Sequence, residues 1–324
     1  MGIQAPAEVK FQLIHDAISK DDNLLVISRL CELAGVSRSG YYAWVEAAPV
    51  RAAREEQDQK DFELIVQAYK YRNYAKGALH IHMRLLHWNT RMNVKKIRRL
   101  MKKYGLRCHI RRRDPQREML RGMQSNQISP NVLDRNFDAY LPREACLTDI
   151  TYIPYNGTFC YLSTIKDVCT KEILAYVLSP NLKVDFVLRT VELLLKDHGK
   201  ELTEGTIIHS DQGSHYTSKR FIEMLADNDF FQSMSRKANC WDNAPQESFF
   251  GHMKDEIMFY VKMCSTYEEV QARIDDWIDY YNNDRYHWDL AKLSPKEYYT
   301  FITTGYYPLP IAHPSRGSAP DPEV

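Results

Sequence analysis

The sequence has few cysteines, no long apolar run and no recognisable export signal. Its seven cysteines are scattered and nowhere spaced as CxxC, so we expect buried thiols rather than a disulfide framework or a zinc module. No apolar stretch approaches the roughly 18 residues of a membrane span. The start, MGIQAPAEVKFQL, lacks the charged-then-apolar pattern of a signal peptide. These absences predict a cytoplasmic protein with no membrane partner.

One long segment contains no acid at all. Between Leu64 and Arg113 there is no Asp or Glu, but there are 15 Lys or Arg residues. The formal net charge of the whole chain is only +1, so the remainder must be acidic. At 324 residues the chain is long enough for two domains. This division of charge predicts a module that binds a polyanion, joined to a part with a different task.

Residues 1–48 have the pattern of short helices. The apolar spacing over residues 27–34 predicts one helix, and Ser37 is the candidate N-cap of a second helix over residues 39–47. Helix, short turn and helix is the plan of a helix-turn-helix module, although two helices of a small bundle would give the same pattern. Residues 49–67 then predict a connecting helix.

Residues 68–115 form a second candidate helix-turn-helix, and this one is basic. Helices are predicted over residues 78–87 and 94–105, with Ile97 and Leu100 on the inner face of the second. A run of charge is often just a solvated face, but cations this dense repel one another unless phosphates neutralise them. We therefore predict that double-stranded DNA is the partner. The predicted DNA-binding residues are Lys95, Lys96, Arg98, Arg99, Lys102, Lys103, Arg111, Arg112 and Arg113.

After a linker over residues 116–140, residues 141–302 change to a strand-rich pattern. Asn156-Gly157 is a strong hairpin signal, and the order is three meander strands, helix, strand, helix, strand, helix. This is the order of a ribonuclease H-like α/β fold, here preceded by all-α helix-turn-helix modules. Residues 303–324 are a tail rich in Pro, Gly and Ser. The predicted strands are 145–155, 158–168, 171–179, 205–211 and 230–235, and the predicted helices are 184–199, 218–228, 243–258 and 267–284.

Two aspartates occupy strand positions where a charge is unusual. Asp149 lies within the first strand, and Asp211 ends the fourth, in IIHSDQGSHYTS. Neighbouring strands lie about 4.8 Å apart, so carboxylates at matched heights face each other, and a hard divalent cation removes their repulsion. Taken singly, each is better explained as a surface acid. The candidates to orient such a site are His209, Gln212, His215 and Asn243.

Glu247 is the third candidate acid, with 35 residues between it and Asp211. It falls in the first turn of a helix that has Asn243 as N-cap and Gln246 at the position of a capping box. Lys254 lies seven residues further on the same helix face, where the spacing alone favours an ion pair with Glu247 over a DNA contact. Three acids from two strands and a helix predict a site for two Mg²⁺ ions, with Mn²⁺ as a substitute, and phosphodiester chemistry.

Four blocks resemble the signature blocks of the insertion sequence three family of transposases, in the superfamily of DDE transposases and retroviral integrases. The blocks are LTDITY, HSDQGSHYTS, SMSRKANCWDNAPQESFF and YYNNDRYHWDLAKLSPKEYY, and the resemblance runs from about residue 36 to about residue 300. It implies a catalytic core of the retroviral integrase type. It also implies Asp149, Asp211 and Glu247 as catalytic, metal-binding acids, and Lys254 as a contact to the transposon end.

The resemblance further implies what the protein does. Family members cut the ends of an insertion sequence and integrate them by 3′-hydroxyl attack, acting as multimers on the terminal inverted repeats and the target DNA. The expected place is the bacterial cytoplasm, with the nucleoid when bound to DNA. The chain departs from the family pattern at Cys146 and Ala238, where Trp and Gly are usual, and lacks zipper heptads. We therefore expect the downstream-frame product, which works with an upstream-frame partner protein.

Two other functions fit the same residues. A catalytically inert DNA-binding regulator would also carry helix-turn-helix pairs, and a structure-selective nuclease of the same fold would also carry three acids. Metal-dependent nicking separates the regulator from the enzymes, and strand joining separates the nuclease from the transposase.

Overall fold

The computed structural model describes six stretches of the chain: residues 5–20, 24–74, 76–108, 129–134, 136–236 and 243–310. Three predicted DNA-binding residues, Arg111, Arg112 and Arg113, lie outside them. The chain divides into two compact units, Met1–Val66 and Gln67–Val324. Within the six stretches, no helix is both long enough and apolar enough to cross a membrane. The sequence also predicted six segments, residues 1–48, 49–67, 68–115, 116–140, 141–302 and 303–324. Their boundaries remain predictions.

The first unit contains the first helix-turn-helix pair. Gly35 ends the first helix of the pair in a left-handed conformation, with a φ of 65°, and Ser37 caps the second. The Ser37 hydroxyl accepts a hydrogen bond from the Gly40 amide at 3.1 Å, as its N-cap position predicts. Ile14 and Tyr41 lie in a small core that joins the three short helices. The elements are α1 (Ala7–Ile18), α2 (Ile27–Ala34), α3 (Arg38–Glu46) and most of α4 (Ala48–Lys70).

The second unit begins with the basic helix-turn-helix pair, α5 (Ala78–His87) and α6 (Val94–Lys103). Asn93 caps α6 by accepting a hydrogen bond from the Lys95 amide at 2.8 Å. Ile97 and Leu100 are fully buried, as the sequence predicted. The cations of α6 alternate with these residues and therefore lie on its outer side.

A five-stranded mixed sheet follows, in the order β3-β2-β1-β4-β5. β1, β2 and β3 form antiparallel pairs, whereas β4 pairs parallel with both β1 and β5. The β1–β2 turn is formed by Asn156 and Gly157, both with positive φ, as the sequence signal requires. The predicted ribonuclease H-like strand arrangement is therefore confirmed. The strands are β1 (Ala145–Tyr155), β2 (Thr158–Asp167), β3 (Ile173–Ser179), β4 (Ile207–Ser210) and β5 (Phe231–Met234).

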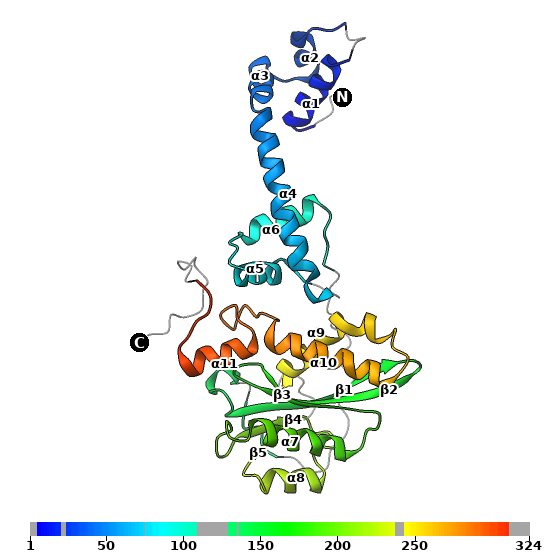
Figure 1. Cartoon of the computed structure of the whole chain (residues 1–324), viewed down its shortest axis with the longest axis vertical. Helices are drawn as coiled ribbons and strands as arrows, with labels where there is room; N and C mark the ends of the chain where they lie inside the picture. Colours follow the sequence, from blue (N-terminus) through cyan, green and yellow to red (C-terminus); the bar gives the residue numbers. More distant parts are fainter. Residues whose placement is uncertain are drawn as a thin grey trace. The chain divides into compact units, whose positions relative to one another are not determined.

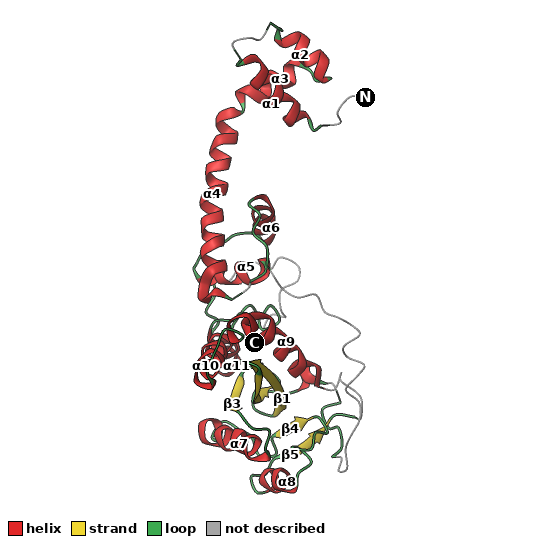
Figure 2. Ribbon diagram, turned by 90° about the vertical axis from the view of Figure 1, so that its right-hand side faces the viewer, coloured by secondary structure: helices red, strands yellow, loops and turns green. Residues whose placement is uncertain are grey.

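Helices cover both faces of this sheet, as Figures 1 and 2 show. On the face covered by α9 and α10, Ile153 and Leu162 pack against Trp277. On the face covered by α7 and α8, Cys146 and Ile165 pack in a second apolar core. We call these the α9 face and the α7 face. The helices are α7 (Val184–His198), α8 (Lys219–Ala226), α9 (Ala244–Val261), α10 (Tyr267–Asn283) and α11 (Pro295–Thr304).

Two local predictions were wrong. No helix was predicted at α11, although Ser294 and Glu297 form a capping box at its start. Conversely, the capping box predicted at the start of α9 does not form. The Asn243 side chain makes no cap hydrogen bond, and Gln246 Nε2 donates instead to Thr164 Oγ1 of β2. Tertiary contact with the sheet thus replaces the local cap.

Candidate active site and DNA-binding surface

The two aspartates lie at corresponding positions of adjacent parallel strands. The last paired residues of β1 and β4 are Leu147 and His209, and Asp149 and Asp211 each follow two residues later. Because side chains alternate along a strand, both aspartates have the same parity as the residues of the α9 face. Asp149 is half-buried and Asp211 is exposed. The structure therefore brings these two predicted acids to the same end of the β1–β4 pair.

Both aspartates affect the pKa of one buried tyrosine, Tyr216. Tyr216 is only 1% exposed, and its hydroxyl lies 3.4 Å from Thr148 Oγ1, beside Asp149 on β1. Burial raises the pKa of Tyr216 well above its ordinary value, and the negative charges of Asp149 and Asp211 raise that pKa further. The Tyr216 hydroxyl therefore stays protonated under the influence of both negative charges.

The turn after β4 holds the Asp211 carboxylate in place. The Gly213 amide donates to Asp211 Oδ1 at 2.9 Å. A Cβ atom at residue 213 would lie 2.9 Å from the same oxygen, so the turn favours glycine. Gln212 Nε2 donates to the carbonyl oxygen of Ser235 at 2.9 Å, which fastens the turn to the end of β5. Gly213 thus lets the backbone come close to the carboxylate.

The four residues predicted to orient the site differ in burial and in the contacts they make. His209 is fully buried, and its ring nitrogens lie 2.8 and 3.0 Å from the hydroxyls of Ser233 and Ser235. It supports β4 from within the sheet and has no surface for DNA. His215 is half-buried, with Nε2 3.3 Å from the carbonyl oxygen of Leu182. Asn243 lies at the start of α9, and Gln212 is part of the Asp211 turn described above.

Glu247 lies in the first turn of α9, as predicted. Both Glu247 and Lys254 are half-buried, and their spacing of seven residues places them on one side of the helix. Between them, an added Cβ at Gly251 would meet nothing within 4 Å. This side of α9 is therefore open enough for a ligand to approach between the acid and the lysine.

The oxygen chemistry at this place suits a hard divalent cation. Two carboxylates lie at the same end of the β1–β4 pair, and the buried Asn243 Oδ1 has no hydrogen-bond partner within the described part of the chain. Oxygen donors of this kind are those that Mg²⁺ prefers. Across the same residues, no three His, Cys, Asp or Glu side chains lie together closely enough to hold a metal ion. The structure thus unites Asp149 and Asp211, but does not show a complete three-acid cluster with Glu247.

Charged contacts fasten the basic helix pair to the helices above the sheet. Arg84 of α5 is 4% exposed and contacts Asp284 at 3.3 Å and the Tyr286 hydroxyl at 2.9 Å. The His87 ring stacks on Tyr286, with ring centroids 3.6 Å apart. Arg72 adds ion pairs to the acids of α10 and to Asp284. Because α5 is fixed in this way, α6 is held by the same compact unit that contains the aspartates.

The cations of α6 lie on the side away from its buried residues. Lys95, Arg98 and Lys102 are exposed, and Arg98 and Lys102 line a pocket of about 390 Å³. Gly77 at the start of α5 lines the same pocket. The surface is cationic and accessible, as DNA contact requires. The other predicted residues of α6 are Lys96, Arg99 and Lys103, of which the first is half-buried and the other two are exposed.

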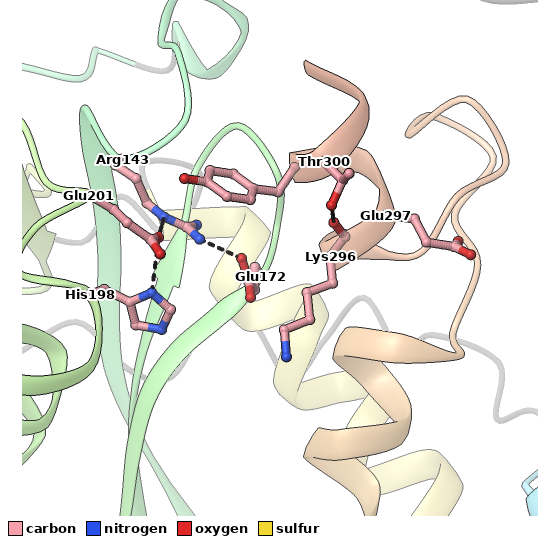
Figure 3. Close-up of a pocket in the computed structure, with 8 residues that line it drawn as sticks. Arg143, Glu172, His198, Glu201, Lys296, Glu297 and Thr300 are labelled. Carbon is pink, nitrogen blue, oxygen red and sulfur yellow. Dashed lines mark hydrogen bonds and ion pairs between the residues drawn. The ribbon is translucent and has the colours of Figure 1, made fainter. Parts of the chain in front are cut away.

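A second pocket, drawn in Figure 3, does not contain the predicted acids. Arg143 lies beside it just before β1, 2% exposed, and pairs with Glu172 at 2.7 Å and Glu201 at 3.0 Å. Its guanidinium also lies 4.1 Å from the ring centre of Tyr299 in α11. These contacts join strand, loop and helix. The pocket is therefore a structural junction, which local sequence patterns do not predict because its members are far apart along the chain.

Comparison with known families defines the class of protein. Residues 139–240 match a family model described as "Integrase core domain", and residues 247–300 match a second model with the same description. Residues 56–114 match a model described as "HTH-like domain". The first two matches include the three predicted acids and the third includes α5 and α6. The chain is thus an integrase-core protein with a helix-turn-helix-like domain, in a superfamily of polynucleotidyl transferases.

Three relatives narrow this class. The chain is 30% identical over 267 residues to "Insertion element IS600 uncharacterized 31 kDa protein" of Shigella sonnei, covering 82% of this chain and 96% of the relative. It is 32% identical over 274 residues to "Putative transposase InsK for insertion sequence element IS150" of Escherichia coli, covering 84% and 93%. "Transposase InsF for insertion sequence IS3A" of the same organism is 26% identical over 283 residues, covering 87% and 96%.

The chain belongs to this family of insertion-sequence transposases, and it is a DNA transposase. The resemblance noted in the sequence is confirmed. Among solved structures, the chain is also similar to the magnesium complex of the HTLV-2 integrase catalytic core domain, at 14% identity and a TM-score of 0.39, over 49% of this chain and 97% of that one.

Proposed function

We propose that this transposase cuts the ends of its insertion sequence and joins them to target DNA by metal-dependent attack of a 3′-hydroxyl on a phosphodiester. Asp149, Asp211 and Glu247 are the proposed catalytic acids and metal ligands. The observation that carries the proposal is the placement of Asp149 and Asp211 at corresponding positions of adjacent parallel strands, with Glu247 at the start of the helix above them. Two carboxylates placed together in this way are stable as anions when a cation is bound between them.

The proposed ions are two Mg²⁺, with Mn²⁺ as a substitute. When bound, they would supply Lewis-acid activation of the attacking hydroxyl and stabilisation of the leaving oxygen. The protein's own part is to hold the carboxylates at fixed positions. The Gly213 amide holds Asp211 through Oδ1, and the first turn of α9 holds Glu247. Lys254, on the same helix side, is proposed to contact a phosphate of the transposon end.

The DNA ligands are proposed to be the terminal inverted repeats and the target. The cations of α6, together with Arg111, Arg112 and Arg113, would neutralise backbone phosphates. Two ends must be cut and joined to one target, which supports action as a homo-oligomer on DNA. A partner protein from an upstream frame stays part of the proposal.

Replacing Asp211 by Asn tests the proposal. The change keeps the shape of the side chain but removes its charge, so we expect joining of an end-containing duplex to fall by roughly a thousandfold or more. Binding to the same duplex, measured by fluorescence anisotropy, should stay within about twofold because the DNA-binding cations are untouched. Undiminished joining by the Asp211→Asn variant would disprove the assignment.

The wild-type protein separates the alternatives in the same assay. A transposase forms joined products from a donor with a free 3′-hydroxyl when Mg²⁺ or Mn²⁺ is present. Nicking without joining would identify a nuclease, and binding without either reaction would identify an inert regulator.

A further inference from the structure

Two buried polar contacts fasten the first turn of α9 to β2. Lys166 Nζ donates to the carbonyl oxygen of Pro245 at 2.6 Å, and Gln246 Nε2 donates to Thr164 Oγ1. Thr164 and Gln246 are fully buried, and Lys166 is 3% exposed. Pro245 and Gln246 directly precede Glu247. The contacts therefore act on the backbone that carries the third proposed acid.

The same contacts lie beside the first proposed acid. In the antiparallel β1–β2 pair, Thr164 is directly opposite Asp149, and Lys166 is opposite Leu147. Directly opposite residues have Cβ atoms about 4.5–5.5 Å apart and point to the same face. Gln246 thus reaches the cross-strand neighbour of Asp149. The Gln246 side chain alone therefore connects the residue opposite Asp149 to the helix turn that carries Glu247.

Polar groups are an expensive way to attach a helix to a sheet. A buried donor or acceptor must find a partner, and a buried lysine must lose its hydration. Burial indeed lowers the pKa of Lys166 to about 7, with further lowering from Lys171. Further along these strands, Leu162 and Ile153 lie in the apolar core of the α9 face. The polar contacts at the first turn of α9 fix direction and register, which apolar packing does not.

We propose that Gln246, Thr164 and Lys166 are positioning residues that hold Glu247 in register with Asp149, so that the carboxylates can share metal ions. The proposal rests on the proposed role of Glu247. It assigns these three residues no contact with DNA or with the reacting atoms. Their loss should weaken metal binding and slow joining, while DNA binding and the remainder of the fold persist. Loss of an outer partner of a metal ligand typically costs 10- to 100-fold in metal affinity or activity.

The test compares variants of the full chain that remove one contact each. Gln246→Met and Lys166→Met keep the length of the side chain, and Thr164→Val keeps its shape. Thr164→Ser restores the hydroxyl and is the conservative rescue. The matched control is Thr190→Val on the α7 face, because Thr190 Oγ1 donates to Ser163 Oγ at 2.9 Å and ties α7 to the same strand through an equally buried pair.

Three measurements are made on each variant. The first is the Mg²⁺ concentration that gives half-maximal joining. The second is Mn²⁺ binding to the protein–DNA complex by electron paramagnetic resonance, which does not depend on turnover. The third is amide hydrogen exchange in the peptide that covers residues 244–252, which reports whether the start of α9 has loosened.

Gln246→Met and Thr164→Val should raise the half-maximal Mg²⁺ concentration about 10- to 100-fold, weaken Mn²⁺ binding similarly and speed exchange over residues 244–252. Thr164→Ser should behave like the wild type. Thr190→Val should lower the thermal midpoint without changing the Mg²⁺ midpoint, because it loosens the opposite face. A Lys166→Met variant with normal metal dependence would remove Lys166 from the set, and the same result for Gln246→Met would overturn the proposal.

A Glu247→Gln variant separates this inference from the proposed function. If Glu247→Gln abolishes joining while Gln246→Met and Thr164→Val have wild-type metal dependence, then Glu247 acts as proposed and the positioning inference fails. If Glu247→Gln joins normally, then the proposed function of Glu247 fails first. Glu247→Gln should leave exchange over residues 244–252 unchanged, since it breaks neither contact to β2.

Discussion

The two faces of the sheet are attached to their helices in different ways. On the α7 face, Ile165 and Ile208 pack against Val191 and Leu194 in an apolar core. On the α9 face, the region near Asp149 contains buried polar groups such as Thr164 and those that bind it, while the apolar core lies further along the strands. The α7 face is thus mainly apolar, with the buried Thr190–Ser163 hydroxyl pair as a polar tie within it. The polar contacts that tie the start of α9 to the sheet lie at the place of the proposed acids.

This difference separates contacts that mainly stabilise the fold from contacts that mainly position a helix turn against a strand. An apolar core tolerates substitutions that keep its volume, because it specifies size more than direction. A hydrogen bond has both a direction and a partner, so it fixes a helix turn against a strand more narrowly. The α7 face can therefore be repacked with little effect on chemistry. Changes of the same size on the α9 face near Thr164 should alter the site.

The largest expected effect on stability is in the apolar face. Leu194 in α7 is fully buried, so Leu194→Ala should leave a cavity and lower the free energy of unfolding by about 3–5 kcal/mol. Urea unfolding measures this loss. Joining per folded molecule, assayed at a temperature where the variant is still folded, should stay near the wild-type value. A variant that is stable but slow would show that the α7 face takes part in the chemistry.

A smaller effect, with a distinct pH dependence, is expected from the buried lysine of the other face. The pKa of Lys166 is about 7 in the folded state because of burial, whereas an unfolded lysine titrates near 10.4. Between these values the unfolded chain binds one more proton than the folded chain, so this group makes stability rise with pH and fall as the pH drops from about 10 to about 7. Below about pH 7 its contribution no longer changes.

The Lys166→Met variant isolates this contribution. It lacks the titrating group, so its stability relative to the wild type should improve by roughly 3–4 kcal/mol as the pH is lowered from about 10 to about 7. Urea unfolding of both proteins over this pH range gives the difference directly. Lys166→Ala is a less suitable choice because it also creates a cavity. A difference that is independent of pH would show that Lys166 is charged and hydrated in the folded protein.

The sequence predicted the strands and most helices of the core because their signals are local. Alternation gave β1, Asn156-Gly157 gave the hairpin, and apolar spacing gave α7 and α10. Asp149 and Asp211 were proposed as site residues for the same reason, since a charge inside a strand or at its end is visible in the sequence itself. Residues 1–108 were predicted as helical, and the helix pairs were found with their turns.

The contacts that depend on distant partners were not predicted. Gln246 has the local signature of a capping box, and only the approach of Thr164 from β2 redirects its side chain. Lys166 lies in the strand segment YLSTIKDV, where a lysine is visible in the sequence. Its partner Pro245, however, is 79 residues away. Arg143 meets Glu172 and Glu201 across loops. Such pairs follow from the fold rather than from the neighbouring sequence.

The smallest expected effects on stability come from two exposed cations, one proposed to bind DNA and one on the α7 face. Arg98 is exposed on α6, and Lys219 is exposed on α8 of the α7 face, where its Nζ lies 3.5 Å from Glu223. Either residue changed to Ala should alter the free energy of unfolding by no more than about 0.5 kcal/mol.

The two variants should differ, however, in anisotropy titrations of an end-containing duplex at several KCl concentrations. Arg98→Ala should reduce the slope of log affinity against log salt by about one, since one phosphate contact is lost, while Lys219→Ala should leave it unchanged. Equal slopes for both variants and the wild type would remove Arg98 from the DNA-binding surface.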